Sequence, residues 1–182
     1  MSLAEKFKEY YTYKDYKTWK GDWELIEGIP FAMSPSPSVK HQLILSKLIY
    51  LLNKEFKKNK CKKCFVLPET DWVISFDTVV RPDISIVCHL ENFEDYINRT
   101  PEVIFEIVSP SSYKRDERLK FELYKKEGVK FYILVYPDLK LIKAYKFENG
   151  NVIFLKIQDN ILEISLDNNC SFKIDINELF EN

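Results

Sequence analysis

The pattern of hydrophobic and polar positions along the chain predicts helices and strands in a mixed order. Between residues 41 and 58, apolar residues recur at positions 44, 45, 48, 49, 51, 52 and 56. This spacing is typical of one apolar face on a long helix, and Ser38 is a suitable N-cap for it. A second, charged helix is expected from about 113 to 127, ending at Gly128.

Strands are expected where the pattern changes to alternation or to continuous apolar runs. The runs at 79–88, 102–108 and 130–137 are typical of central strands covered on both faces. The remaining expected elements are strands at 64–68 and 70–76, hairpins at 23–33 and 139–158 about Glu27-Gly28 and Asn149-Gly150, a strand in ILEISL (161–166), and short helices opening with the Thr12–Asp15 capping box and near 176–181. This order predicts a single α/β domain over residues 1–182, with a mixed central β-sheet flanked by helices, an N-terminal hairpin and a C-terminal hairpin.

Composition narrows the class of protein. The chain has 182 residues, of which 46% are hydrophobic, and it carries a net charge of −1. No apolar run reaches the length of a membrane span, so no membrane partner is expected. The first twenty residues are charged throughout and lack the apolar core of a signal peptide. A cytoplasmic protein with reduced cysteines is therefore expected.

Two local features leave alternatives open. Cys61 and Cys64 have metal-ligand spacing, but zinc needs four ligands and only Cys88 and His89 are further candidates, so a structural zinc is the minor alternative. Residues 54–63 hold six lysines and one glutamate. This run is either a solvated face or a DNA-backbone contact that supplies affinity without sequence readout. The lysines in question are Lys57, Lys58, Lys60, Lys62 and Lys63.

Two carboxylates lie within the apolar runs. Asp83 lies in VVRPDISIVC (79–88) and Glu106 lies in PEVIFEIVSP (101–110). A buried charge is costly unless it is paired or binds a metal. Two such carboxylates in neighbouring strands predict a site for a hard divalent cation and, with it, metal-dependent phosphodiester chemistry.

The helix after Glu106 offers a cation to this site. At 100° per residue, Lys120 falls within the apolar arc centred near Leu119 and Leu123, whereas the other basic residues between 115 and 126 fall on the solvent side. Lys120 then either forms a buried pair with Asp116 at i, i+4 spacing or points toward the sheet near Asp83 and Glu106.

These segments, taken in order, resemble a known family. The stretch WELIEGIPFAMSPSPSVKHQ, then VVRPDISIV, FEIVSPSS, RDERLKFELYKKEGV and KFYILVYP, is similar to the Uma-type restriction endonucleases of the PD-(D/E)XK nuclease superfamily. The resemblance covers about residues 12 to 180. It implies a restriction-endonuclease-like fold and hydrolysis of DNA phosphodiesters with a metal, usually Mg²⁺, or Mn²⁺.

The resemblance also assigns roles to residues. Asp83, Glu106 and the backbone carbonyl of Ile107 would ligate the metal. The superfamily lysine is expected two residues after the glutamate, but Val108 stands there. Lys120 is the expected substitute and would position or activate the water.

Two further residues and two function classes complete the expectations. Glu27 and His41 match family positions and could line the cleft, although a turn residue and a helix-start residue are the simpler interpretations. The first function class is a metal-dependent DNA endonuclease, with a homodimer expected if both strands are cut. The second is a catalytically inactive DNA-binding or interaction domain on the same fold, which the missing lysine and the near-zero charge favour.

Overall fold

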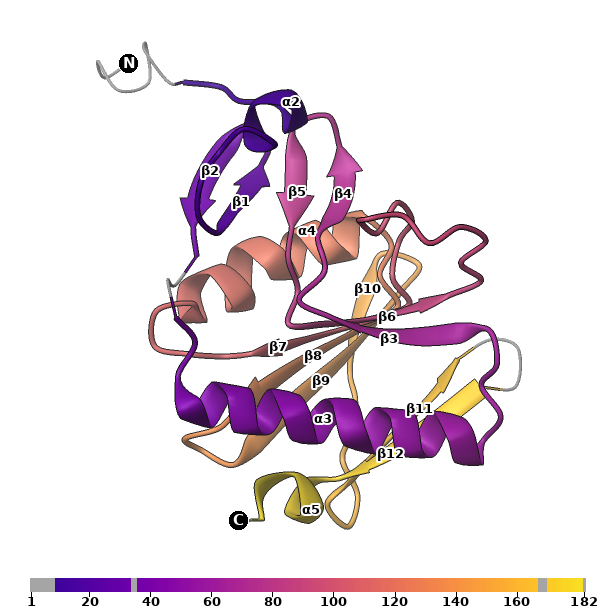
Figure 1. Cartoon of the computed structure of the whole chain (residues 1–182). Coiled ribbons are helices and arrows are strands. Elements are labelled where there is room, and N and C mark those ends of the chain that lie inside the picture. The colour runs from indigo at the N-terminus through magenta and orange to yellow at the C-terminus, as the bar shows by residue number, and fades with distance from the viewer. Residues whose placement is uncertain (1–8, 34–35, 167–169, 182) are drawn as a thin grey trace.

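A six-stranded sheet forms the centre of the computed structural model, which describes residues 9–33, 36–166 and 170–181 (Figure 1). Its order is β10-β9-β8-β7-β6-β3, and β7 and β8 are its parallel pair while the other neighbours are antiparallel. The sheet is therefore mixed, as expected. Its strands are β3 (Cys64–Pro68), β6 (Ile84–Cys88), β7 (Val103–Ile107), β8 (Phe131–Tyr136), β9 (Leu141–Glu148) and β10 (Asn151–Phe154).

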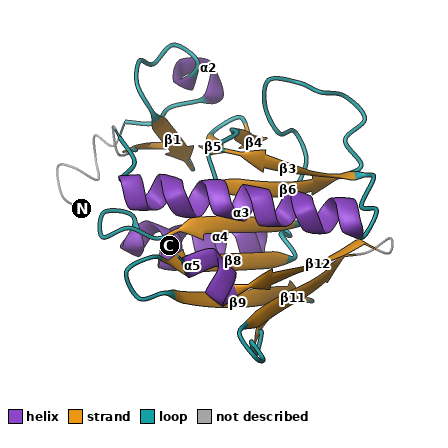
Figure 2. Cartoon of the chain, turned by 60° about the horizontal axis from the view of Figure 1, so that its bottom comes forward, coloured by secondary structure: helices purple, strands orange, loops and turns teal. Residues whose placement is uncertain are grey.

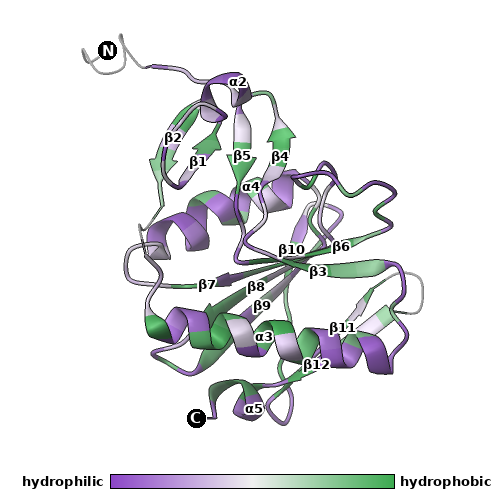
Figure 3. Cartoon of the chain, viewed as in Figure 1, coloured by the Kyte–Doolittle hydropathy of each residue, from purple (hydrophilic) through white to green (hydrophobic). Residues whose placement is uncertain are grey.

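Helices cover both faces of this sheet. The long helix α3 (Val39–Lys58) lies across one face, and the π-helix η1 (Arg115–Lys120) with its continuation α4 (Phe121–Lys126) lies on the other (Figure 2). Hydrophobic and hydrophilic stretches alternate along α3, in keeping with one apolar face (Figure 3). The Ser38 side chain accepts a hydrogen bond from the backbone N–H of His41, which confirms the predicted N-cap.

Two smaller sheets complete the fold. A four-stranded sheet has the order β2-β1-β5-β4, and β11 pairs with β12 beside α3. The predicted N-terminal hairpin, the hairpin about Asn149-Gly150 and the Thr12–Asp15 capping box are confirmed. The remaining elements are α2 (Tyr13–Tyr16), β1 (Trp23–Ile26), β2 (Ile29–Ala32), β4 (Trp72–Ser75), β5 (Thr78–Val80), β11 (Ile161–Leu166), β12 (Cys170–Asp175) and α5 (Ile176–Phe180).

Strand β7 separates two hydrophobic cores. Its residues Val103, Phe105 and Ile107 face the core beneath α3, whereas Ile104 faces the core beneath α4. Since successive side chains of a strand point to opposite faces, Glu106 shares the α4 side with Ile104. The apolar run therefore carries a carboxylate into a layer that would otherwise be hydrocarbon.

The expected strand at 79–88 is in fact two strands in two sheets. Strand β5 ends at Val80 in the four-stranded sheet, and β6 begins at Ile84 in the six-stranded sheet. Pro82 has no backbone N–H, so it cannot continue a ladder, and the N–H of Arg81 is donated to Glu24 Oε1 at 3.0 Å instead. The prediction of one long strand is wrong at this break, and Asp83 lies in the connection.

The helix that follows β7 departs from the expected α-helical projection. Lys120, Leu123 and Tyr124 are buried as predicted, but Leu119 is 37% exposed. Residues 115–120 are π-helical, and the wider i→i+5 turn shifts the angular position of each side chain relative to 100° per residue. Among the described residues, no helix is long and apolar enough to cross a membrane.

The expectation of reduced cysteines is wrong for this structure. Cys61 is bonded to Cys170 and Cys64 to Cys88. The minor zinc alternative is also contradicted, because a sulfur bonded to another sulfur is not a thiolate ligand. Both disulfides lie at the far end of α3 from His41.

Candidate active site

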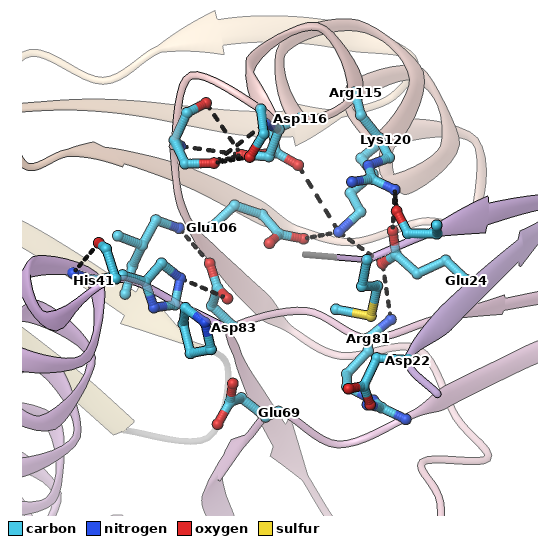
Figure 4. A pocket seen from close by; sticks show the side chains of 18 of the residues that line it. Asp22, Glu24, His41, Glu69, Arg81, Asp83, Glu106, Arg115, Asp116 and Lys120 are labelled. Atoms are coloured by element: carbon cyan, nitrogen blue, oxygen red, sulfur yellow. Dashed lines mark hydrogen bonds and ion pairs between the residues drawn. The ribbon is translucent and has the colours of Figure 1, made fainter. Parts of the chain in front are cut away.

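A pocket of about 770 Å³ opens between the N-terminal end of α3, the β1–β2 hairpin and the C-terminal end of β7 (Figure 4). Its lining carries six carboxylates and three permanent cations. The carboxylates belong to Asp22, Glu24, Glu69, Asp83, Glu106 and Asp116, and the cations to Arg81, Arg115 and Lys120. This excess of negative charge favours a bound cation over a bare phosphate.

Asp83 reaches the pocket from the connection before β6, not from inside a strand. Its side chain is 17% exposed. Oδ1 lies 3.1 Å from Nε2 of His41, and Oδ2 accepts the backbone N–H of Ile107 at 2.5 Å. The expectation that Asp83 is buried within a strand is therefore corrected, but its place beside β7 is as predicted.

Glu106 is buried on the α4 side of β7, with 3% exposure. Its Oε1 accepts hydrogen bonds from Lys120 Nζ at 2.9 Å and from the Tyr124 hydroxyl at 2.8 Å. No donor to Oε2 is found among the described residues. Since Ile84 pairs with Phe105, continuing that antiparallel register places Asp83 opposite Glu106. The sheet thus brings together the two carboxylates that the sequence singled out.

Lys120 is the centre of a buried network of charges. Its Nζ lies 2.7 Å from Glu24 Oε1, 2.9 Å from Glu106 Oε1 and 3.9 Å from Asp116 Oδ1. Both alternatives for Lys120 therefore hold, because it approaches Asp116 and also points at the sheet. The stronger contacts are those with Glu24 and Glu106.

The protonation of this network follows from burial and charge. Burial raises the pKa of Glu106 well above its usual value, against the opposing effect of the Lys120 ammonium. Burial likewise raises the pKa of Asp116. For Lys120, burial disfavours the charged form, but the nearby carboxylates, Glu106 foremost, raise its pKa above the ordinary value. The neighbouring carboxylates therefore favour the ammonium form of Lys120.

Glu24 is the site residue that the sequence pattern did not reveal. It lies in β1 between Trp23 and Leu25, where simple alternation places it on the polar side of a hairpin. In the structure it is 1% exposed, because Lys120 and Arg115 of η1 cover that side, with Arg115 Nη1 at 3.6 Å from Oε2. The signal that could have found it is the family stretch WELIEG, which carries this glutamate.

Val108 occupies the place where the superfamily lysine is expected. It follows β7, is 9% exposed and belongs to the hydrophobic core beneath α4. Its side chain shares the face of Glu106, two residues earlier. The ammonium of Lys120 approaches Glu106 on that same face from the neighbouring helix, so the positive charge is present although the strand position is apolar.

Of the other predicted site residues, His41 lines the pocket, and Glu27 and the lysines of the basic run do not. His41 lines the pocket and contacts Asp83. Glu27 does not line it, because it is an exposed residue of the β1–β2 turn with φ of 49°, paired with Lys126 at 3.1 Å. The lysines of the basic run are exposed at the other end of α3, with Lys57 about 24 Å from His41 along the helix axis. Their contact with DNA stays a prediction.

The donors in the pocket fit a hard divalent cation. Among the described residues, no three His, Cys, Asp or Glu side chains form a ready-made metal cage. Mg²⁺ does not need one, since it is commonly held by one or two carboxylates and keeps several waters. The N–H and C=O of one residue in a strand point to the same edge, so the Ile107 carbonyl faces the edge on which its N–H meets Asp83. Asp83, Glu106 and Ile107 therefore offer a suitable oxygen set.

Comparison with known proteins agrees with this geometry. A family model named Uma2 and described as "Putative restriction endonuclease" matches residues 6–176. The chain belongs to the Uma2 family. Among curated proteins, none matches the chain.

A solved structure supports the fold of this Uma2 member. It is the crystal structure of a protein from Anabaena variabilis ATCC 29413, described as a putative nuclease belonging to DUF820. The two share 18% sequence identity and superpose with a TM-score of 0.74, over 93% of this chain and 97% of the other. The predicted restriction-endonuclease-like fold is confirmed.

Proposed function

We propose that this Uma2 member is a divalent-metal-dependent endonuclease that hydrolyses DNA phosphodiester bonds. The observation that carries the proposal is the convergence of Asp83 and Glu106 at one end of the pocket, with the Lys120 ammonium 2.9 Å from Glu106. The descriptions of the family, "Putative restriction endonuclease", and of the structural relative, "putative nuclease", support this proposal.

The roles of the residues follow from their contacts. Asp83, Glu106 and the Ile107 carbonyl would hold Mg²⁺ or Mn²⁺. When bound, the ion supplies a Lewis acid that lowers the pKa of a water and stabilises charge on the phosphate. Lys120 holds the Glu106 carboxyl in place through its hydrogen bond, and its ammonium opposes the rise in the pKa of Glu106 that burial causes. The hydroxyl of Tyr124, four residues after Lys120, donates to the same oxygen.

The substrate is DNA in this proposal, and a homodimer would supply the second site that cutting both strands requires. The pocket is rich in carboxylates, so a phosphate enters only after a cation has reduced the negative charge. Metal binding is therefore expected to precede productive DNA binding.

One observation favours the second class, an inactive DNA-binding domain. Oε1 of Glu106 already accepts hydrogen bonds from Lys120 and Tyr124, so this buried oxygen has partners without a metal. A domain that had lost cleavage could keep this network for stability alone.

A plasmid-nicking experiment with Asp83→Asn separates the two classes. Supercoiled plasmid is incubated with the wild type, Asp83→Asn or the control Asp138→Asn, each with Mg²⁺, Mn²⁺ or EDTA. Asp83 is the safer target, because its side chain is 17% exposed whereas Glu106 and Lys120 lie within the buried network. Asp138 is an exposed aspartate that pairs with Lys40 and does not line the pocket.

We expect metal-dependent nicking by the wild type and Asp138→Asn, and a loss of at least about a hundredfold with Asp83→Asn, because a metal ligand is removed. DNA binding without nicking by the wild type in either metal would support the inactive domain instead.

A further inference from the structure

We infer that His41 is a positioning residue that holds the Asp83 carboxylate in place for the metal through its Nε2–H, and is not itself a metal ligand. This inference rests on the proposed function, since it concerns the same metal site. It assigns a role to a residue that the sequence could place only at the edge of the cleft.

The first argument is that the side chain of Asp83 has few contacts. Its backbone C=O accepts the N–H of Glu69 at 3.1 Å, but its carboxylate extends from the connection between β5 and β6, one residue before β6 begins. Two contacts from two different elements fix its carboxylate, one from the Ile107 N–H in β7 and one from His41 in α3. Removing the histidine leaves a single hydrogen bond, about which the side chain can turn.

The second argument is that α3 holds the histidine ring rigidly. His41 lies in the first turn of the helix, and its backbone N–H is donated to Ser38 Oγ at 3.1 Å. Ile44 and Leu45, one turn further on, are buried in the core beneath the sheet. The side chain of His41 is only 15% exposed, so the ring has little freedom to swing away.

The third argument concerns the two ring nitrogens. An ionised carboxylate can only accept hydrogen bonds, so the contact at 3.1 Å requires a proton on Nε2 of His41. Nε2 then has no lone pair to give to a metal. Nδ1 is buried and has no hydrogen-bond partner among the described residues, so it does not face the Asp83 carboxylate. The ring thus acts on the metal through Asp83.

A pair of amide substitutions tests which nitrogen acts. In His41→Gln, the amide nitrogen is separated from Cα by the same number of bonds as Nε2, so it can still donate to Asp83. In His41→Asn, the amide nitrogen corresponds to Nδ1 and falls short. His89→Gln, at the other histidine of the chain, is the matched control, and Asp83→Asn removes the ligand itself.

The readout is Mn²⁺ affinity, measured without DNA from the loss of the free-ion electron paramagnetic resonance signal, with circular dichroism to confirm folding. Removal of a residue that orients a metal ligand typically weakens metal binding about 10- to 100-fold. We expect that loss for His41→Asn and His41→Ala, and binding close to wild type for His41→Gln and His89→Gln. Saturating Mn²⁺ should restore most of the nicking rate of His41→Asn, because the ligands remain.

The possible failures can be told apart. If the wild type binds Mn²⁺ and His41→Asn binds it equally well, the inference about His41 is overturned while the metal site stands. If His41→Gln is as weak as His41→Asn, the Nε2–H does not carry the effect and the inference is also wrong. If the wild type itself does not bind Mn²⁺ at millimolar concentrations, the proposed function fails, and the role of His41 fails with it.

Discussion

At Lys120, burial disfavours the charged ammonium and the surrounding carboxylates favour it. Its side chain is 4% exposed and within 4 Å of three carboxylates, those of Glu24, Glu106 and Asp116. A buried ion pair repays its desolvation only when the geometry is good, and its presence alone is weak evidence for stability. Loss of one partner is different, because it leaves the remaining charges buried and unpaired.

Replacement of Lys120 by Met should therefore destabilise the protein strongly, and more so at higher pH. We expect a loss of about 3–5 kcal/mol in the free energy of unfolding at pH 7. Burial already raises the pKa of Glu106, and losing the ammonium raises it further. A carboxyl with a raised folded-state pKa binds its proton more tightly in the folded protein, so it stabilises at low pH, and that contribution is lost as pH rises through the folded pKa.

Urea denaturation of Lys120→Met at pH 5 and pH 7 measures this, with Lys126→Met as the control. Lys126 lies on the same helix but is 65% exposed and pairs with Glu27 outside the pocket. The control should change stability by less than about 1 kcal/mol. Equal losses for Lys120→Met at both pH values would contradict the electrostatic account and indicate a packing defect instead.

At the scale of elements, Glu117 ties the π-helix η1 to the strands beneath it. Its Oε1 accepts hydrogen bonds from the Tyr136 hydroxyl of β8 and from Lys143 Nζ of β9, the latter at 2.9 Å. Burial opposes the charge, but these donors lower the pKa of Glu117 below its usual value. These contacts of Glu117 help to hold η1 against the sheet, and they therefore help to position Lys120.

The contacts of Glu117 predict that its contribution to stability depends on pH in the direction opposite to that of Glu106. A carboxyl with a lowered folded-state pKa stabilises above its unfolded pKa, and this contribution is lost as pH falls through the folded pKa. Glu117→Gln should therefore cost about 1–2 kcal/mol at pH 7, and this cost should shrink as the pH is lowered into the acid range and through the folded-state pKa of Glu117. Thermal unfolding of both proteins across this range checks the prediction, with Glu122→Gln, an exposed glutamate of α4, as the control. A difference that stays constant with pH would contradict it.

The sequence could predict most elements because their patterns were local. The apolar stripe of residues 41–58 and the turns at Glu27-Gly28 and Asn149-Gly150 act within a few residues, and α3 and both hairpins formed as expected. The break at Pro82 and the exposure of Leu119 were missed, since each depends on tertiary context. Neither a change from one sheet to another nor a π-helical turn alters the local pattern of apolar and polar residues. The sequence pattern therefore cannot reveal them.

The candidate site was partly predictable for the same reason. Asp83 and Glu106 stand out because charges within apolar runs are rare and costly. The burial of Lys120 was predicted from its angular position on the helix. It is confirmed in spite of the π-helical turn, whereas the predicted burial of Leu119 is not. Glu24 could not be found by pattern, since its burial is caused by Arg115 and Lys120, about ninety residues later in the chain.

On the scale of the whole molecule, the two ends of α3 have different properties. One end carries His41 and the charged pocket, and the other leads directly to Cys61 and the two disulfides. Strand β6 likewise has a pocket residue at one end and a disulfide at the other, because Asp83 precedes its first residue and Cys88 is its last. Cross-links at one end and loops at the other predict that the covalent bonds stabilise the fold without shaping the site.

Reduction of the disulfides should consequently lower stability and leave metal binding unchanged. The Cys61–Cys170 bond closes a separation of 109 residues and the Cys64–Cys88 bond one of 24. In the chain-entropy model, loops of these sizes correspond to about 4.7 and about 3.5 kcal/mol of stabilisation, so loss of the longer loop should cost more. Unfolding of the paired serine variants of each bond, compared with the wild type, measures the two contributions, and Mn²⁺ binding by the same variants tests the independence of the site.

Whether the four cysteines of the isolated protein are oxidised or reduced tests whether the two disulfides form in the cell. Titration without reductant should find no free thiol among the four cysteines, and titration after reduction and unfolding should find four. The cytoplasmic location expected from the sequence stays a prediction, and it conflicts with two stable disulfides, because glutathione and thioredoxin keep most cytosolic thiols reduced. Four reactive thiols in the freshly isolated, folded protein would overturn the cross-links and favour the cytosol. Their absence would instead support the two disulfides and favour an oxidising compartment.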